Sequence, residues 1–167
     1  EKDLPIPLED NSYDTVVCTE VLEHLETIHE VFAELVRISR GYILISLPNN
    51  FSVGFKNYLF EKPFSDSLEK KKKYGKYMKF YGLPFEIPPD RHKWFFDYIE
   101  AREFMEYKAK KHGVEIVKQF GLDAPSGFQA KLFRLLVETL LGTNTRVRIF
   151  CGTYWCALKK SVSQTPG

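Results

Sequence analysis

Two runs of sequence decide the fold: Asp10-Asn-Ser-Tyr-Asp-Thr-Val-Val-Cys-Thr-Glu-Val-Leu-Glu-His-Leu25 and Tyr42-Ile-Leu-Ile-Ser-Leu-Pro-Asn49. Each contains a short, almost continuously apolar stretch, Tyr13–Cys18 in the first run and Tyr42–Leu47 in the second. Short β-branched stretches of this kind are typical of strands buried inside a parallel sheet. Both stretches are therefore predicted to be strands.

The residues between the two runs predict a helix. Its apolar positions recur at helical spacing, at Ile28, Val31, Phe32, Leu35 and Ile38. Thr27 and Glu30 have the spacing of a capping box, and Gly41 is expected to end the helix. A strand, a helix and a strand in succession form a βαβ unit, whose crossover is expected to be right-handed.

Regular patterns return after an irregular insert at residues 50–92, which is rich in aromatic residues and lysine. A helix is expected to begin at Asp97, with Glu100 completing a capping box, and to end at Gly113. The following stretch, Val114–Phe120, alternates like a half-buried strand.

The last part of the chain predicts one more helix and one more strand. Ser126 and Gln129 have the spacing of another capping box, which would open an apolar helix that ends at Gly142. The final strand is expected at Val147–Leu158, with a bulge or bend at Gly152. The polar tail, residues 161–167, is expected to be disordered.

Composition narrows the class of protein. The chain has 167 residues, and its 24 Lys and Arg against 22 Asp and Glu do not require an anionic partner such as nucleic acid. No apolar run is long enough to cross a bilayer and the first residues do not resemble a signal peptide, so a cytoplasmic protein is expected. The three cysteines are expected to be reduced. The spacing of the histidines, for example His24 and His29, suits no common metal motif, so no bound metal is expected.

The order Asp10–Leu25, helix, Tyr42–Asn49 resembles the centre of class I S-adenosylmethionine-dependent methyltransferases, in particular those of methyltransferase type 11. The resemblance implies an α/β fold with a Rossmann-like, doubly wound sheet, of which residues 1–160 would form the C-terminal part. The insert at residues 50–92 would then be a substrate lid. Transfer of a methyl group from S-adenosylmethionine to a small or polymer-linked acceptor is the activity that follows from this family.

One departure from the family pattern is clear. Class I methyltransferases open with a strand and a Gly-x-Gly loop that holds the cofactor, whereas no Gly-x-Gly occurs in this sequence. An N-terminal half is therefore expected to precede the chain, and the chain by itself is expected to bind cofactor weakly and to be inactive. The sheet edge left without its neighbour would be covered by that half or by a second copy.

The resemblance also implies site residues. The expected cofactor contacts are Asp3, Leu4, Cys18, Thr19 and Glu20, the expected catalytic residues are His24 and His92, and the expected substrate contacts are Asn49, Tyr58 and Trp94. Purely structural roles are the alternatives for several of these residues. Cys18 could simply pack in the core, His24 could hold its loop by a hydrogen bond, and the loop around His92 and Trp94 could simply pack.

The insert allows a second reading of function. Lys70–Lys73, interleaved with tyrosine and phenylalanine further on, could contact an anionic acceptor, nucleic acid or a membrane surface, or could form a solvated face. Nucleic acid is the less expected partner because no RNA-binding motif accompanies the lysines. The alternative to the enzyme is a non-catalytic, methyltransferase-like module that binds a partner protein or nucleic acid through this insert.

Overall fold

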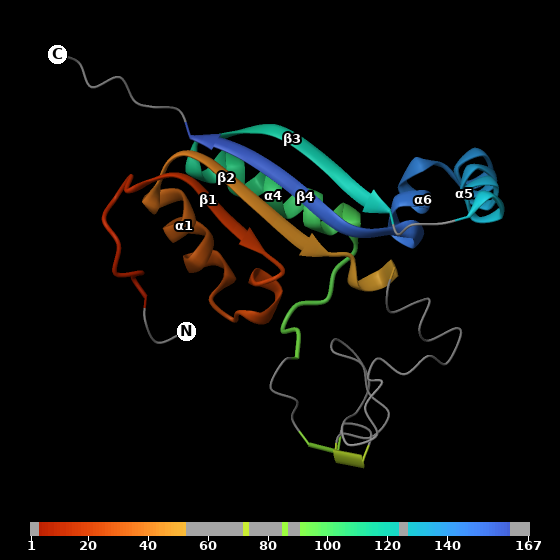
Figure 1. The fold of residues 1–167 in the computed structure, drawn as a ribbon, viewed down its shortest axis with the longest axis horizontal. Helices are drawn as coiled ribbons and strands as arrows, with labels where there is room; N and C mark the ends of the chain where they lie inside the picture. Colours follow the sequence, from red (N-terminus) through yellow and green to blue (C-terminus); the bar gives the residue numbers. More distant parts are fainter. Residues whose placement is uncertain (1–3, 53–71, 74–84, 87–90, 124–126, 161–167) are drawn as a thin grey trace.

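The computed structural model describes residues 4–52, 72–73, 85–86, 91–123 and 127–160, and Figure 1 shows their arrangement. Asp3, Tyr58, most of the predicted lid and the tail 161–167 lie outside the described residues. The elements are β1 (Tyr13–Thr19), a 3-10 turn η1 (Leu22–His24), α1 (Ile28–Ile38), β2 (Ser39–Pro48), α4 (Tyr98–His112), β3 (Val114–Asp123), α5 (Phe128–Leu141), α6 (Thr143–Phe150) and β4 (Cys151–Lys160).

The strands form a four-stranded mixed sheet in the order β1-β2-β4-β3. β1 pairs with β2 in parallel, with Val17 opposite Leu44, and α1 connects the two strands. β4 runs antiparallel to both of its neighbours, β2 and β3. The predicted strand–helix–strand unit is therefore confirmed, and β1 and β3 are the edge strands of the sheet.

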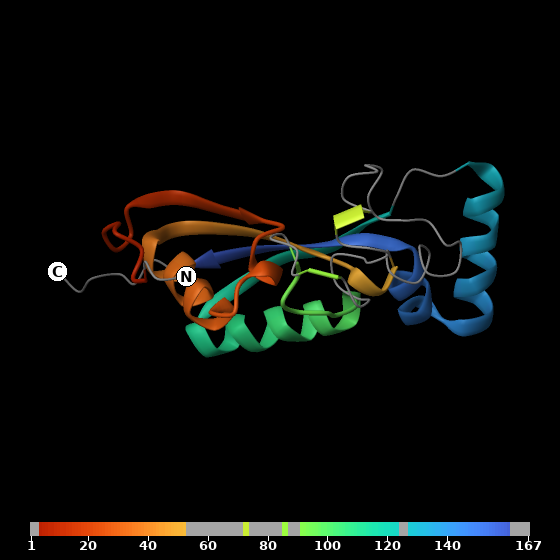
Figure 2. The same cartoon turned by 90° about the horizontal axis from the view of Figure 1, so that it is seen from below.

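The two longest sheet-covering helices lie on one face of the sheet. Figure 2 shows α1 and α4 below the strands, where side chains such as Phe32, Ile45 and Met105 form the buried core. The opposite face carries no helix among the described residues, and its side chains are more exposed. Val17 is 59% exposed there, and Trp155 stacks on Phe120 with ring centroids 6.2 Å apart.

The end of α1 differs from the prediction. Thr27 precedes the helix, but its side chain makes no capping hydrogen bond, and the helix ends at Ile38 rather than at Gly41. Gly41 lies inside β2, where a Cβ atom would be 2.6 Å from the main-chain oxygen of Asp14 in β1. The glycine allows two strands to approach closely, so its predicted role as a helix stop was wrong.

α4 begins and ends as predicted. Asp97 accepts hydrogen bonds from the main chain of Ile99 and Glu100, and Glu100 completes the capping box. Gly113 takes the left-handed conformation, with φ 64°, that commonly ends helices. On its inner side the helix buries Lys108, which is 1% exposed.

The segment before β4 also differs from the prediction. Residues 147–150 belong to α6, and the strand begins only at Cys151. The Asn49 side chain explains the difference, because its Nδ2 donates to the carbonyl oxygens of Val147, Arg148 and Cys151 at 2.7–3.1 Å. The predicted irregularity at Gly152 is confirmed: Thr153 pairs with Leu122 and Cys151 with Asp123, so Gly152 is skipped in the ladder.

α5 presents an unusually apolar surface. Its N-cap is Gly127 without a side-chain hydrogen bond, and Ser126, the first residue of the predicted capping box, lies outside the described residues. The predicted end at Gly142 is confirmed. Only Val137 is buried on this helix. No described helix combines the length and the apolarity required to span a bilayer. The exposed large apolar side chains are Phe128, Leu132, Phe133, Leu135, Leu136, Leu140 and Leu141.

Candidate functional site

The carboxyl ends of β1 and β2 lie side by side, which is where open α/β sheets bind ligands. Glu20 follows β1 with φ 52°, a left-handed conformation that is uncommon for a residue with a side chain. Its main-chain nitrogen donates to the Ser46 carbonyl at 3.3 Å, and its carboxylate accepts from the Ser46 hydroxyl at 3.3 Å. Backbone strain of this kind is often retained at functional sites.

Three side chains that can bind metals or move protons meet just beyond this turn. Glu23 and His24 belong to η1, and His92 comes from the segment before α4. Their nearest ligand atoms all lie within 4.8 Å of one another. The rings of His24 and His92 meet edge to face, with centroids 4.5 Å apart, and a Glu23 carboxylate oxygen lies 3.7 Å from His24 Nε2. Glu23 is fully buried, at 0% exposed.

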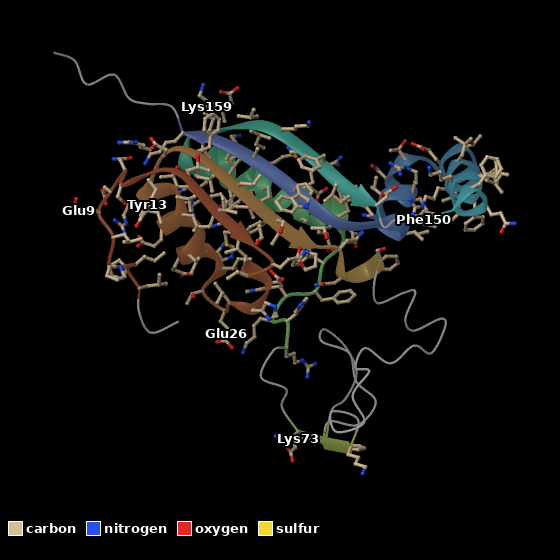
Figure 3. The ribbon with its side chains drawn as sticks, in the orientation of Figure 1. Glu9, Tyr13, Glu26, Lys73, Phe150 and Lys159 are labelled. Carbon is tan, nitrogen blue, oxygen red and sulfur yellow. The ribbon has the colours of Figure 1, made fainter. Side chains whose placement is uncertain are left out.

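Main-chain contacts hold His92 at this position. The nitrogens of Lys93 and Trp94 both donate to the Glu23 carbonyl oxygen, at 2.8 and 3.3 Å. The Lys93 ammonium also pairs with Glu26 at 2.8 Å; Figure 3 labels Glu26 at this end of the molecule. The loop that precedes α4 is therefore fastened to η1 by two main-chain hydrogen bonds and to Glu26 by an ion pair.

Asn50 orients the His92 ring. Its side-chain nitrogen donates to the Trp94 carbonyl at 2.9 Å, and its oxygen lies 3.1 Å from His92 Nδ1. A carbonyl oxygen can only accept, so the contact with Trp94 fixes which end of the amide faces the imidazole. Nδ1 must then carry the hydrogen in the neutral ring, which places the lone pair on Nε2.

The side chain of Asn49, a predicted substrate contact, is used inside the protein. Besides its bonds to α6 and to the first residue of β4, it accepts a hydrogen bond from the Ser52 main chain at 3.1 Å, and Asn49 is 0% exposed. Ser52 itself donates to the Ile149 carbonyl at 2.6 Å. The Asn49 amide therefore joins the turn after β2 to α6. A contact between Asn49 and the substrate stays a prediction.

The predicted cofactor residues differ in their surroundings. Cys18 is buried, and burial together with the nearby Glu23 carboxylate raises the pKa of its thiol to about 11, so the thiol is neutral near pH 7. Thr19, the last residue of β1, and Glu20, the residue after it, are exposed, and Leu4 is half-buried. Packing accounts for Cys18 by itself, whereas Thr19 and Glu20 present atoms to solvent at the ligand-binding edge.

A small apolar cavity lies beside the cluster. Its volume is about 220 Å³, and Trp94 lines it together with side chains from α1, β2 and α4, among them Ile28, Leu47 and Phe104. Trp94 is therefore a wall of the cavity and a neighbour of His92 at the same time. An apolar cavity beside a few convergent polar groups is the usual form of a ligand site.

The sequence analysis assigned no role to Glu23, a member of the cluster, or to Asn50, which contacts His92. The sequence analysis tested the histidines only for the spacing of helical metal motifs. That test rejects the pair His24 and His29, but it cannot detect that His24 and His92 lie close together. In the structure, His29 is exposed and its ring lies against Phe104, outside the cluster. The Glu23-His24 dipeptide after a strand was the available signal.

Comparison with known proteins supports the family that the sequence resembles. Residues 2–45 match the family model described as a methyltransferase domain. The fold aligns with a SAM-dependent methyltransferase from Archaeoglobus fulgidus at 18% identity and a TM-score of 0.51, covering 92% of this chain and 62% of that one. The chain has the class I methyltransferase fold.

A second alignment agrees with this fold. The chain also aligns with the small RNA methyltransferase HEN1 at 13% identity and a TM-score of 0.52, covering 92% of this chain and 15% of that one. It thus spans less than two thirds of either structure. No curated protein matches the sequence. The predicted resemblance and the predicted Rossmann-like α/β fold are both confirmed.

Proposed function

We propose that this chain is the acceptor-facing part of an enzyme that transfers a methyl group from S-adenosylmethionine. The observation that carries the proposal is a group of polar side chains beyond the carboxyl ends of two parallel strands, namely Glu20, Glu23, His24 and His92. The match of residues 2–45 to a methyltransferase domain supports it. This edge is where the methyltransferase fold would place cofactor and acceptor.

The residues present fit one wall of a cofactor site. The exposed residues Thr19 and Glu20 would line the cofactor, and Asp3 and Leu4 are further proposed cofactor contacts. S-adenosylmethionine, when bound, supplies a methyl group on a positively charged sulfur. No Gly-x-Gly occurs in the 167 residues, so we assign the remaining wall to a segment that precedes Glu1 in the whole protein. The same segment would cover β1 and the bare face of the sheet.

The side chains of the chain would mainly align and desolvate the acceptor, because methyl transfer from a sulfonium requires little else. In the chain without a bound metal ion, His92 Nε2 would accept a proton from an acceptor held at the cluster, while Asn50 keeps the ring in place. Trp94 and the cavity beside it would exclude water from one side of the acceptor. The insert, residues 50–92, would act as the lid and select the acceptor.

Calorimetric titration with S-adenosylhomocysteine tests the proposal. A protein extended upstream of Glu1 should bind this product with micromolar affinity, whereas the 167-residue chain should show weak binding or none. Deleting the upstream segment from the extended protein should abolish the heat signal. Absence of binding by the extended, folded protein at millimolar ligand would overturn the proposed function.

A further inference from the structure

We infer that Glu23, His24 and His92 bind a divalent transition-metal ion. The three ligand atoms come from two separate segments and converge within 4.8 Å, a grouping that no other described residues of these types make. The inference departs from the expectation of no bound metal, which considered only histidines at regular spacing. It goes beyond the proposed function, because the ion can be measured without cofactor or acceptor.

The geometry requires only a small contraction. Nitrogen and oxygen ligands lie about 2.0–2.2 Å from Zn²⁺, so two ligands of a tetrahedral site are about 3.4 Å apart. Glu23 Oε1 and His24 Nε2 are already 3.7 Å apart. The widest separation in the cluster, within 4.8 Å, would close by side-chain rotations of about an ångström. The main chain can stay where η1 and the loop hold it.

The supporting contacts are those that metal-binding histidines use. A ligating imidazole usually donates its other N–H to an oxygen, which fixes the tautomer and the orientation of the ring. Asn50 provides this oxygen for His92 Nδ1 at 3.1 Å, and the Trp94 carbonyl fixes the Asn50 amide in turn. His92 thereby directs the lone pair of Nε2 away from Asn50, while the loop is fastened to the Glu23 carbonyl by two main-chain hydrogen bonds.

The donor set selects the kind of ion. Two imidazole nitrogens and one carboxylate oxygen suit Zn²⁺, Fe²⁺, Co²⁺, Ni²⁺ or Mn²⁺ better than Ca²⁺ or Mg²⁺, which prefer oxygen ligands throughout. With neutral histidines the three side chains carry a net charge of −1, which a buried site can balance with a cation. Three protein ligands leave coordination positions open, as in metal sites that bind a substrate.

Cobalt titration of the chain tests the inference directly. We expect one Co²⁺ per chain, seen as visible absorption bands, and we expect Zn²⁺ to displace it. His92→Gln and His24→Gln should each weaken Co²⁺ binding at least tenfold. The matched control is His29→Gln, because His29 is a nearby exposed histidine outside the cluster. This variant should bind Co²⁺ with the affinity of the parent chain.

Thermal unfolding of each variant by circular dichroism separates loss of ligand from loss of fold. Glu23 is fully buried, so Glu23→Gln could fail to fold, and the two histidine variants at less buried positions then decide the question. The inference is overturned if the folded parent chain gives no cobalt bands at millimolar Co²⁺, or if both histidine variants bind as tightly as His29→Gln. Displacement of Co²⁺ by millimolar Mg²⁺ would overturn the assigned class of ion.

Discussion

The indole nitrogen of Trp94 donates a hydrogen bond of 2.6 Å to the carbonyl oxygen of Leu25. This bond fastens the loop that carries His92 to the segment just after His24. We expect Trp94→Phe, which keeps an aromatic ring but removes the donor, to loosen this loop. Co²⁺ affinity should fall by about tenfold, as for other residues that position a metal ligand.

Phe95→Leu provides the control for Trp94. Phe95 is the next aromatic residue on the same loop and is 54% exposed. Cobalt affinity should stay within twofold of the parent value in this variant, and both variants should unfold at nearly the parent temperature. A parent-like affinity in Trp94→Phe would show that the indole hydrogen bond does not position His92.

The glycine in β2 predicts a stability effect. In Gly41→Ala the added methyl group would lie 2.6 Å from the Asp14 main-chain oxygen, so β1 and β2 must shift apart. We expect a loss of about 1–3 kcal/mol in the free energy of unfolding, measured by urea denaturation. Gly152→Ala is the control, because its methyl group would meet only the Leu122 oxygen at an ordinary 3.6 Å. Equal losses in both variants would refute the steric argument.

Lys108 is a buried cation that the fold tolerates. Its ammonium lies 5.4 Å from the Phe32 ring centroid and 5.7 Å from that of Phe104, and it donates to the His29 carbonyl at 3.3 Å. We expect Lys108→Met to raise the free energy of unfolding by about 1 kcal/mol, because replacing a buried charge by an apolar side chain is often stabilising. Lys110→Met, on an exposed position of the same helix, should change it by less than about 0.5 kcal/mol.

The same lysine predicts a dependence on pH. Burial, and to a lesser degree Lys111, lowers the pKa of Lys108 in the folded chain below its ordinary value of 10.5. Between the folded and the unfolded pKa the unfolded chain binds more protons, so rising pH stabilises the parent chain through this group. The advantage of Lys108→Met should therefore shrink as pH rises toward 10.5. A constant difference between the two proteins from pH 7 to 10.5 would show that the ammonium is not desolvated.

The sequence predicted best those elements whose signals are local. The apolar runs of β1 and β2 and the Asp97 capping box with Gly113 depend on neighbouring residues, and each was confirmed. A glycine after a helical pattern is ambiguous, because the same residue type ends helices and allows strands to approach closely. Gly41 serves the close approach of two strands, because a Cβ atom at this position would meet the main-chain oxygen of Asp14 on the neighbouring strand.

The remaining differences have long-range causes. Residues 147–150 are compatible with a strand by themselves, but the amide of Asn49, far away in sequence, binds the carbonyl oxygens at the end of α6. The cluster of Glu23, His24 and His92 was missed for the same reason, because the contacts that hold the loop before α4 against η1 join residues far apart in sequence. Spacing along the sequence contains no information about such contacts.

The exposed leucines and phenylalanines of α5 have a practical consequence for the behaviour of the chain in solution. Phe128 is 80% exposed, and it forms an exposed apolar surface together with the neighbouring leucines and phenylalanine of α5. Kosmotropic salts such as ammonium sulfate strengthen the association of such surfaces. The chain should therefore be retained on hydrophobic-interaction resins, and it should salt out early. Crystallisation trials and scattering measurements would be best begun at low ionic strength with mild detergent.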